Sequence, residues 1–318
     1  MLLRGLRWGL AGALVAWTLT RLLGLEAGWP LVPLLALTPW IAALALIAAL
    51  IGALLRHRLF TLVCGACALV LAVLIAPRVI PNRAPDDAEG VRLRVLAINV
   101  ASNPGTAQSV RALIRRYRPD VVSVLELPLD VVHAYEVAGI PELLPHQVLE
   151  PRPGFAGTGL YSRIPLRVAP RPVNTLFAIS AASMAPERAA PLEVFAVHTR
   201  APTSPGETRQ WKTDLRALPP TGEGGMRILA GDFNATLDHH EFRRLVDRGY
   251  HDTGEQAGIG LRMTWSEDSW LLPLVHIDHV LADRRIRVIS ARTVPIGGSD
   301  HRGVFTELLL PDADRGGG

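Results

Sequence analysis

The 318-residue sequence has little cysteine, and both of its cysteines lie in an apolar stretch. Cys64 and Cys67 fall within residues 59–76, which hold no charged side chain. This placement excludes a disulfide framework for the polar remainder of the chain, which at about 220 residues is long enough to bury a core without one. Thiolates are costly in apolar surroundings, so we interpret the pair as packing residues and not as a redox or metal site.

Charge is also absent from long runs near the N-terminus. Residues 29–55 and 59–76 have none, and residues 8–25 have only Arg21. Each run approaches or exceeds the length of about 20 residues that crosses a bilayer as a helix. A cleaved signal peptide would account for the first run but not for the other two. The sequence therefore predicts three transmembrane helices.

Arginine placement predicts how these helices lie in the membrane. Arg4 and Arg7 precede the first run, and Arg56 and Arg58 fill the turn between the second and the third. Cytoplasmic loops are enriched in basic residues, so both groups are expected on the cytoplasmic side. After three spans the rest of the chain lies outside the cytoplasm. We therefore expect a multi-pass inner-membrane protein with a cytoplasmic N-terminus and an extracytoplasmic polar region.

The polar region lacks the basic excess that the whole-chain pI of 9.6 would indicate. Residues 1–83 hold seven of the 33 basic residues and one of the 29 acidic ones, which leaves 26 and 28 in residues 84–318. A near-neutral region does not produce the strong basic field that drives non-specific DNA binding. A local basic groove stays compatible with these counts.

Composition divides the chain into four parts. Residues 1–77 are the predicted membrane domain. Residues 78–90 carry prolines and acids without periodicity and are expected to be a linker that lifts the next domain off the membrane. Residues 91–311 are the predicted functional domain, and residues 312–318 are polar, glycine-ended and expected to be disordered.

Strand and helix signals alternate at the start of the functional domain. Residues 91–100 and 121–127 are apolar strand patterns, and residues 106–118 place their apolar side chains on one helical face. A strand, helix and strand of this length are most simply a parallel crossover. Asn99 and Glu126, near the ends of the two strands, are therefore expected at the same edge of one sheet.

The middle of the domain gives weaker signals. Residues 128–153 indicate only loop and a short helix. Residues 192–198 are a strand that ends on His198, and Ser204 to Glu207 is a capping box that begins a helix to about residue 218. Asp238 with Glu241 is expected to cap a further helix that ends at Gly249, with His239 and His240 in solvent.

Three apolar stretches break into polar residues where a buried strand would not. Residues 226–235 end in Gly231-Asp232-Phe233-Asn234, residues 276–280 contain Asp278 and His279, and residues 298–302 contain Asp300 and His301. Asp232 and Asn234 share one face of a strand, since residues two apart point to the same side. Capping of the following turn is the alternative. Buried polar groups need partners, so a functional site explains the pattern better.

These stretches resemble the C-terminal motifs of the endonuclease/exonuclease/phosphatase superfamily, which are metal-dependent phosphoesterases. The order and spacing of Gly231-Asp232-Phe233-Asn234, Ile277-Asp278-His279 and Ser299-Asp300-His301 fit that family. Residues 157–165 and the pair Thr264-Trp265 are also similar to family segments. The resemblance implies an α/β fold, a four-layer α/β/β/α sandwich of two packed sheets with helices outside, and hydrolysis of phosphate esters by in-line attack of water.

The resemblance also implies roles for individual residues. It makes Glu126 the principal ligand of Mg²⁺ or Mn²⁺, with Asn99 and Asp300 near the same ion. These hard oxygen donors suit such ions. Glu126 could otherwise be an exposed edge carboxylate, and His198 a satisfied core histidine. The catalytic set implied is Asp232, Asn234, His198, Asp278 and His301, with Asp278 aiming the His301 ring. Weaker candidates for substrate contact are Tyr161, Arg200 and Asn103, and His279 is expected to be structural.

The chain departs from the family pattern at Ala101, where many relatives carry a second Asn or Asp. Asn103 could substitute for it, and the number of metal ions is open. The substrate is also open between nucleic acid and lipid or sugar phosphates. The expected partners are that phosphate ester and the bilayer, and the sequence indicates no obligate protein partner. The alternative from another class is a catalytically silent, membrane-tethered binding module that retains the fold.

Overall fold

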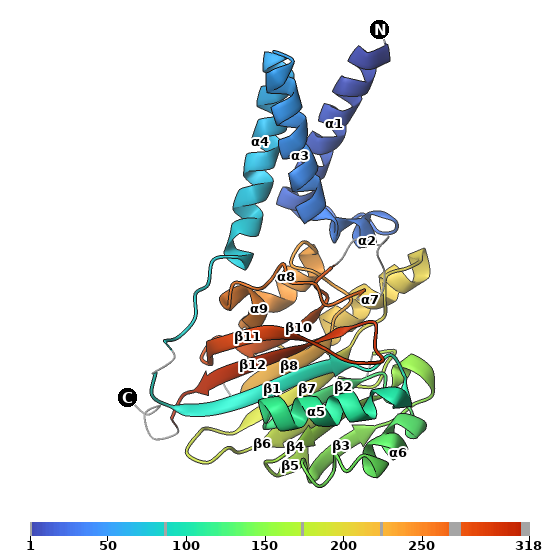
Figure 1. Ribbon diagram of the computed structural model, residues 1–318, viewed down its shortest axis with the longest axis vertical. Coiled ribbons are helices and arrows are strands. Elements are labelled where there is room, and N and C mark those ends of the chain that lie inside the picture. The colour runs from blue at the N-terminus through green and yellow to red at the C-terminus, as the bar shows by residue number, and fades with distance from the viewer. Residues whose placement is uncertain (1, 86–87, 173–174, 223–224, 267–274, 313–318) are drawn as a thin grey trace.

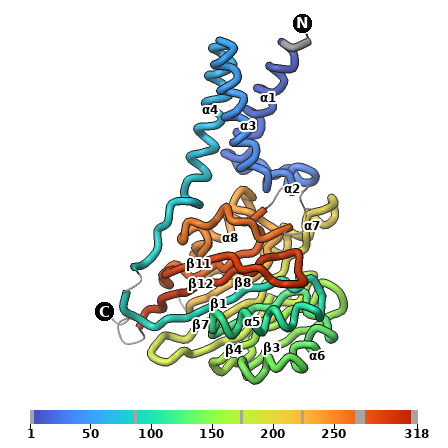
Figure 2. The backbone as a smooth tube through the Cα atoms, in the orientation of Figure 1, coloured from blue at the N-terminus to red at the C-terminus, as the bar shows by residue number. Residues whose placement is uncertain are grey.

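The computed structural model describes residues 2–85, 88–172, 175–222, 225–266 and 275–312. A bundle of long helices projects from a larger domain built on two β-sheets (Figure 1). The same division is clear in the backbone trace, where the N-terminus lies at the far end of the bundle (Figure 2).

The bundle is formed by the apolar runs of the N-terminal region. It comprises α1 (Leu2–Leu23), α3 (Thr38–Leu54) and α4 (Arg58–Ile75), with the short α2 (Leu31–Leu35) between α1 and α3. Small and apolar side chains of α1, α3 and α4, Cys64 and Cys67 among them, form its interior. A 3₁₀ turn, η1 (Ala76–Arg78), ends α4.

The prediction of three transmembrane helices is not confirmed. By length and composition, one helix of the described residues, Arg58–Arg78, is long and apolar enough to cross a membrane. Thr38–Leu54 is apolar but shorter. The first predicted span forms α1, whose arginines lower its mean hydropathy. Three spans therefore stay a prediction.

The first sheet holds the N-terminal and C-terminal strands of the domain side by side. Its six strands run in the order β11-β12-β1-β2-β4-β3, and β1 pairs with β2 in parallel, as the crossover predicts. The other pairs are antiparallel. The strands are β1 (Val91–Asn99), β2 (Val121–Leu125), β3 (His146–Glu150), β4 (Thr158–Ser162), β11 (Arg287–Pro295) and β12 (Arg302–Leu310).

The second sheet has the order β5-β6-β7-β8-β10-β9. Its central pair, β7 and β8, is parallel, with His198 opposite Asp232. Gly231 permits that close pairing, because a Cβ at this position would lie 2.0 Å from the Val197 carbonyl oxygen. The strands are β5 (Leu166–Val168), β6 (Ser180–Met184), β7 (Leu192–His198), β8 (Met226–Asp232), β9 (Tyr250–Asp252) and β10 (Asp278–Asp283).

Helices cover the outer face of each sheet, which gives the predicted four layers. The side chains between the sheets form one apolar core. A second core lies between the first sheet and α5 (Ala107–Tyr117) and α6 (Leu129–Val137). A third lies between the second sheet and α7 (Pro205–Ala217) and α8 (His240–Val246). Shorter elements are η2 (Pro104–Thr106), η3 (Gly154–Ala156) and α9 (Thr253–Gln256).

Most predicted elements are present, and the largest miss is in residues 128–153. These residues form α6 and the edge strand β3, where the sequence indicated only loop and a short helix. The strand β3 is buried on neither face, so its sequence lacks the apolar alternation that would have predicted it.

The segment 78–90 is not a free spacer. Arg78 is buried, Asn82 N donates to Gln256 O, and Ala84 N donates to Val288 O. Ala84 also packs in a small apolar cluster with Ile289. The described part of this segment therefore lies along the edge of the domain, and the predicted tail beyond residue 312 lies outside the described residues.

Two arginines, one on α1 and one on η1, converge on one buried carboxylate. Asp238 accepts from Arg21 Nε at 2.8 Å and from Arg78 Nη1 and Nη2 at 2.7 and 2.6 Å. All three side chains are buried. The prediction that Asp238 caps α8 is therefore wrong, because its oxygens are used by these guanidinium groups.

The connection between α1 and α3 replaces that cap and docks on the domain. The Glu26 carboxylate accepts from the backbone N–H groups of His240 and Glu241 at the start of α8. Val32 is fully buried in the core beneath α7 and α8, and its carbonyl oxygen lies 2.9 Å from His239 Nε2. His239 is therefore buried against α2 and does not face solvent as predicted.

Candidate active site

Four strand ends meet at one pocket between the two sheets. The parallel pairs β1/β2 and β7/β8 place Asn99, Glu126, His198 and Asp232 at the same rim. A pocket of about 550 Å³ opens there. Most of the predicted catalytic and metal residues line it: Glu126, His198, Asp232, Asn234, Asp300 and His301.

Asn99 joins two carboxylates at the floor of the pocket. Its Nδ2 donates to Glu126 Oε1 at 3.0 Å and to Asp232 Oδ2 at 3.1 Å. Its Oδ1 accepts from Ala101 N at 3.0 Å. Asn99 therefore presents its nitrogen to the carboxylates, whereas a cation held by Glu126 would attract its oxygen.

Two of the site residues have a positive φ, a backbone conformation that residues other than glycine rarely adopt. Glu126 has φ 56° directly after β2, and Asn234 has φ 46° two residues after Asp232. The Asn234 conformation is held by its backbone N–H, which donates to Asp232 Oδ1 at 2.8 Å, and by its Nδ2, which donates to Thr199 O at 3.0 Å. Such strain persists where surrounding contacts enforce it, and it is frequent at active sites.

Asp278 and His301 form a buried pair. His301 Nδ1 lies 2.9 Å from Asp278 Oδ2, and His301 Nε2 lies 3.9 Å from Asp232 Oδ2. Burial works against the charged ring, but the Asp278 carboxylate outweighs it and raises the pKa of His301 to about 10. The ring is therefore an imidazolium at neutral pH, and it directs Nε2 towards the pocket.

The pKa of His198 is shifted in the opposite direction from that of His301. Burial, with a further effect from cationic His301, lowers the pKa of His198 to about 4. Its Nδ1 lies 3.0 Å from Phe155 O, so Nδ1 carries the proton and donates it to that carbonyl. Nε2 is then a free acceptor 3.7 Å from Asp232 Oδ2 and 4.0 Å from Glu126 Oε1.

Asp232 is placed to exchange a proton near neutral pH. Burial first, and then the Asp278 charge, raise the pKa of Asp232 to about 7. Glu126 is also buried, and burial raises its pKa. In the described part of the chain, neither carboxylate is paired with a lysine or arginine. Neutral His198 lies 3.7 Å from Asp232 and 4.0 Å from Glu126, and cationic His301 lies 3.9 Å from Asp232.

This donor set fits a divalent cation. Among the described residues, the Glu126 carboxylate has no lysine or arginine partner, and the half-exposed Asp300 carboxylate faces the same pocket. Asp232 and Asp278 place further carboxylate oxygens close together beside the same pocket. Carboxylate oxygens in this arrangement suit Mg²⁺ or Mn²⁺ better than softer ions.

The weaker candidates are placed differently from the main set. Tyr161 packs against Tyr135 in the core beneath α5 and α6, away from the pocket. Arg200 lines the pocket, with its guanidinium bonded to Glu207 and lying over the Phe177 ring.

Asn103 belongs to the loop that supports the site. Its Nδ2 donates to Gly298 O at 2.8 Å, and its Oδ1 accepts from Gly105 N at 2.9 Å. Both ends of the amide are therefore engaged with backbone. Asn103 ties the loop after β1 to the loop before Asp300 and does not replace a ligand at Ala101.

Several pocket residues were not predicted. Trp265 Nε1 donates to Asp300 Oδ2 at 3.0 Å, and Thr264 Oγ1 accepts from the N–H groups of Ile277 and Asp278, which explains the Thr-Trp pair. Apolar walls come from Phe155, Phe177, Val275 and Ile277, and from Pro33 and Ala36 near α2. The last two lie in an apolar run, where periodicity carries no signal for a distant site.

Comparison with known proteins agrees with this geometry. The sequence model described as "Endonuclease/Exonuclease/phosphatase family" matches residues 96–301, which spans the pocket residues from the first sheet to His301. The chain belongs to the endonuclease/exonuclease/phosphatase family. Members of this family are phosphodiesterases, nucleases and phosphatases that generally use divalent metals. A comparison with curated proteins found no match to the chain.

Solved structures of the family share the fold. An endonuclease/exonuclease/phosphatase from Beutenbergia cavernae is 20% identical, with a TM-score of 0.56 over 69% of this chain and 72% of that one. Truncated Caenorhabditis elegans TDP2 is 14% identical, with a TM-score of 0.56 over 70% of this chain and all of that one. D. rerio TDP2 complexed with single-strand DNA product is 18% identical, with a TM-score of 0.53 over 68% and 98%.

Proposed function

We propose that this family member is a membrane-anchored, divalent-metal-dependent phosphoesterase. The observation that carries the proposal is the meeting of Glu126, Asp232 and the Asp278–His301 pair in one pocket from different strands. Glu126 and Asp300 would hold the ion, with Asn99 beside it. When bound, the ion would supply positive charge against the phosphate.

The protein groups divide the remaining tasks. Asp232 would orient the attacking water and accept its proton, since its pKa lies near 7. Cationic His301 would stabilise the negative charge that develops on the phosphoryl oxygens. His198 Nε2 carries no proton at neutral pH, because Phe155 O holds the ring proton on Nδ1, so it would first take up the proton that Asp232 accepts from the attacking water and then pass it to the leaving oxygen. Asn234 Nδ2 would have to leave Thr199 O to reach a phosphate oxygen.

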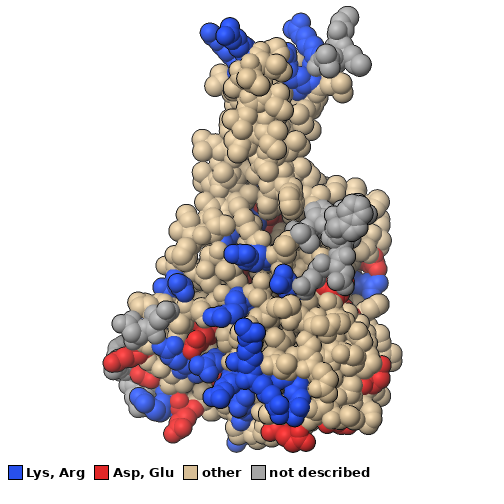
Figure 3. Space-filling model, in the orientation of Figure 1, with Lys and Arg blue, Asp and Glu red and all other residues tan. Residues whose placement is uncertain are grey.

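Membrane anchoring is supported by the surface of the helix bundle. Large apolar side chains along it are exposed, for example Leu50 (61%), Leu62 (68%) and Leu69 (66%). On the face seen in Figure 3, the bundle shows no charged side chain along its length and basic side chains at its far end. That end would face the cytoplasm under the positive-inside rule, which would leave the catalytic domain on the other side.

For the substrate, we infer an amphiphilic phosphate ester that lies in the same membrane. Pro33 and Ala36, on the connection that docks through Val32, form part of the pocket wall, together with Phe177 and Val275. An apolar wall continuous with a membrane-side segment would accept an acyl or prenyl chain while the polar floor binds phosphate. A nucleic-acid substrate is the second candidate, because one similar structure, D. rerio TDP2, holds a single-strand DNA product.

The full-length chain in detergent tests the proposal. It should hydrolyse bis-p-nitrophenyl phosphate with Mg²⁺ or Mn²⁺, and EDTA should abolish the activity. Asp232→Ala and His301→Ala should each lower kcat by about 10² or more while the folded spectrum is retained. An inactive wild-type protein across nucleic-acid, lipid and sugar phosphate substrates would instead favour the silent binding module.

A further inference from the structure

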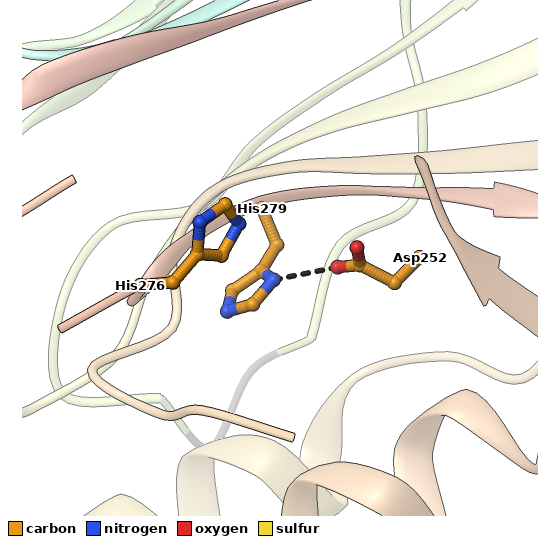
Figure 4. A group of neighbouring side chains, drawn as sticks. All are labelled: Asp252, His276 and His279. Carbon is orange, nitrogen blue, oxygen red and sulfur yellow. Dashed lines mark hydrogen bonds and ion pairs between the residues drawn. The ribbon is translucent and has the colours of Figure 1, made fainter. Parts of the chain in front are cut away.

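A second cluster of metal-ligand side chains lies apart from the catalytic pocket. Asp252 ends β9, His279 lies on β10, and His276 precedes that strand. All three are buried, and each offers one ligand atom within 4.8 Å of the others. The two imidazole rings lie side by side, and Asp252 faces His279 (Figure 4). None of the three lines the pocket described above.

The hydrogen bonds of the two imidazoles leave one nitrogen of each directed inwards. His279 Nε2 lies 2.9 Å from Ala235 O, and His276 Nδ1 is bonded to Arg262 O. A carbonyl only accepts, so these two nitrogens carry protons. Metal-binding histidines are commonly oriented in this way, with the second nitrogen donating to a backbone carbonyl.

The two inward nitrogens lie near the carboxylate of Asp252. His279 Nδ1 lies 2.5 Å from Asp252 Oδ2. His276 Nε2 is buried and, within the described ranges, has no hydrogen-bond partner. The second oxygen, Asp252 Oδ1, accepts from Glu255 N at 2.7 Å, which fixes the orientation of the carboxylate. Carboxylates that bind metals are commonly oriented by hydrogen bonds of this kind.

A glycine keeps the space between these groups open. A Cβ built at Gly254 would lie 3.0 Å from Asp252 Oδ1 and 3.2 Å from His276 Nε2. Any larger residue would fill the gap that these two atoms share. The backbone of Gly254 does not require glycine, since its φ is not in the left-handed region.

We propose that Asp252, His276 and His279 bind a second divalent ion of the zinc class. Two imidazoles and one carboxylate are a zinc-type donor set, unlike the oxygen donors of the catalytic pocket. Ligands about 2.0–2.2 Å from one ion lie about 3.3 Å apart, so the Asp252–His279 pair has to open by less than about 1 Å. The ion takes the place of the proton between Asp252 and His279, and that proton leaves to solvent on binding.

Such an ion would act on catalysis by positioning. His276 and His279 flank Asp278, which accepts from His301 on the other side of the strand. An ion bound on one side of residues 276–279 would fix the backbone that carries Asp278. The three residues are therefore positioning residues, and none of them touches the reacting atoms.

The test measures zinc bound by the full-length chain in detergent, purified through a tag without histidine and stripped with a chelator. After incubation with zinc and dialysis, the wild type should retain one equivalent that Glu126→Gln also retains. His276→Gln and Gly254→Ala should each lose it. The matched control is His251→Gln, which changes a neighbouring histidine on β9 outside the cluster and should keep the ion. Cobalt in place of zinc should give the absorption of a nitrogen-liganded ion in the wild type and in His251→Gln, but not in His276→Gln or Gly254→Ala.

Binding should also tighten as pH rises, because a proton is released, and zinc should raise the Tm of the wild type but not of Gly254→Ala. No retained zinc in the wild type, or retention that His276→Gln and Gly254→Ala leave unchanged, overturns the proposal. If His276→Gln does not fold, Gly254→Ala decides the outcome alone. These results do not depend on phosphoesterase activity.

Discussion

His301 Nδ1 lies 2.9 Å from Asp278 Oδ2, and both side chains are almost fully buried. The two residues come from strands of different sheets, since Asp278 begins β10 and His301 directly precedes β12. This contact is an ion pair between the two sheets. It holds the imidazole as a cation beside the pocket.

Removing the Asp278 carboxylate should change the pH dependence of kcat/KM. The pKa of His301 is raised to about 10, so the ring is charged below that pH and loses its charge above it. In Asp278→Asn the burial cost is no longer opposed by this partner, so the pKa of His301 should fall. The alkaline limb of kcat/KM should then move towards neutral pH, as a pH series from 5 to 10 would measure. Asp283→Asn, at the other end of β10, should leave the limb in place. An unshifted limb in Asp278→Asn would contradict the assignment.

Glu126→Gln should weaken binding of the proposed catalytic ion. The variant keeps the size of the side chain and the hydrogen-bonding capacity towards Asn99 and Ser102 but removes the charge. We expect the Mg²⁺ concentration for half-maximal activity to rise by more than about tenfold, since even outer contacts of a metal site change affinity by about that factor. A magnesium titration of the initial rate measures this. An unchanged midpoint would show that Glu126 is not a ligand.

Asp238→Ala should destabilise the protein strongly. It would leave the Arg21 and Arg78 guanidinium groups buried without their shared partner, which typically costs about 3–5 kcal/mol. Thermal unfolding of the full chain in detergent should show a large fall in Tm. Asp247→Ala removes the carboxylate of an exposed pair with Arg284 and should change stability by less than about 1 kcal/mol. Equal effects from the two variants would show that the contact of Asp238 with Arg21 and Arg78 does not stabilise the packing of the bundle on the domain.

A charge at Ala36, directly after α2, should impair binding of a long apolar chain. Ala36→Asp should place a charge in the apolar wall of the pocket and lower the rate on a long-chain phosphate ester by about tenfold, because the desolvated carboxylate is costly beside an apolar chain. The rate on bis-p-nitrophenyl phosphate should change little. Ala27→Asp makes the same change at an exposed position of the same connection and should affect neither substrate. Equal losses on both substrates in Ala36→Asp would contradict an apolar-chain site.

The sequence by itself determined the elements whose patterns are local. Apolar strand patterns predicted β1, β2 and β7, a capping box predicted α7, and the parallel crossover placed Asn99 beside Glu126. Glu126, Asp232 and His301 could be named because polar groups interrupt apolar stretches there and because those stretches resemble the motifs of the family. Strand β3, which has no buried face, gave no such signal.

Only the tertiary structure decided which distant groups meet. Asp238 looked like a helix cap because capping is a local rule, but two arginines far away in the chain take its oxygens. Tyr161 lies on a strand of the correct sheet and still faces the outer core, since a strand alternates between two faces. Pro33 and Ala36 joined the pocket because α2 docks through buried contacts that no hydropathy pattern encodes. Sequence periodicity reports which side of an element is buried, whereas the partner against which it is buried is set by packing of the whole chain.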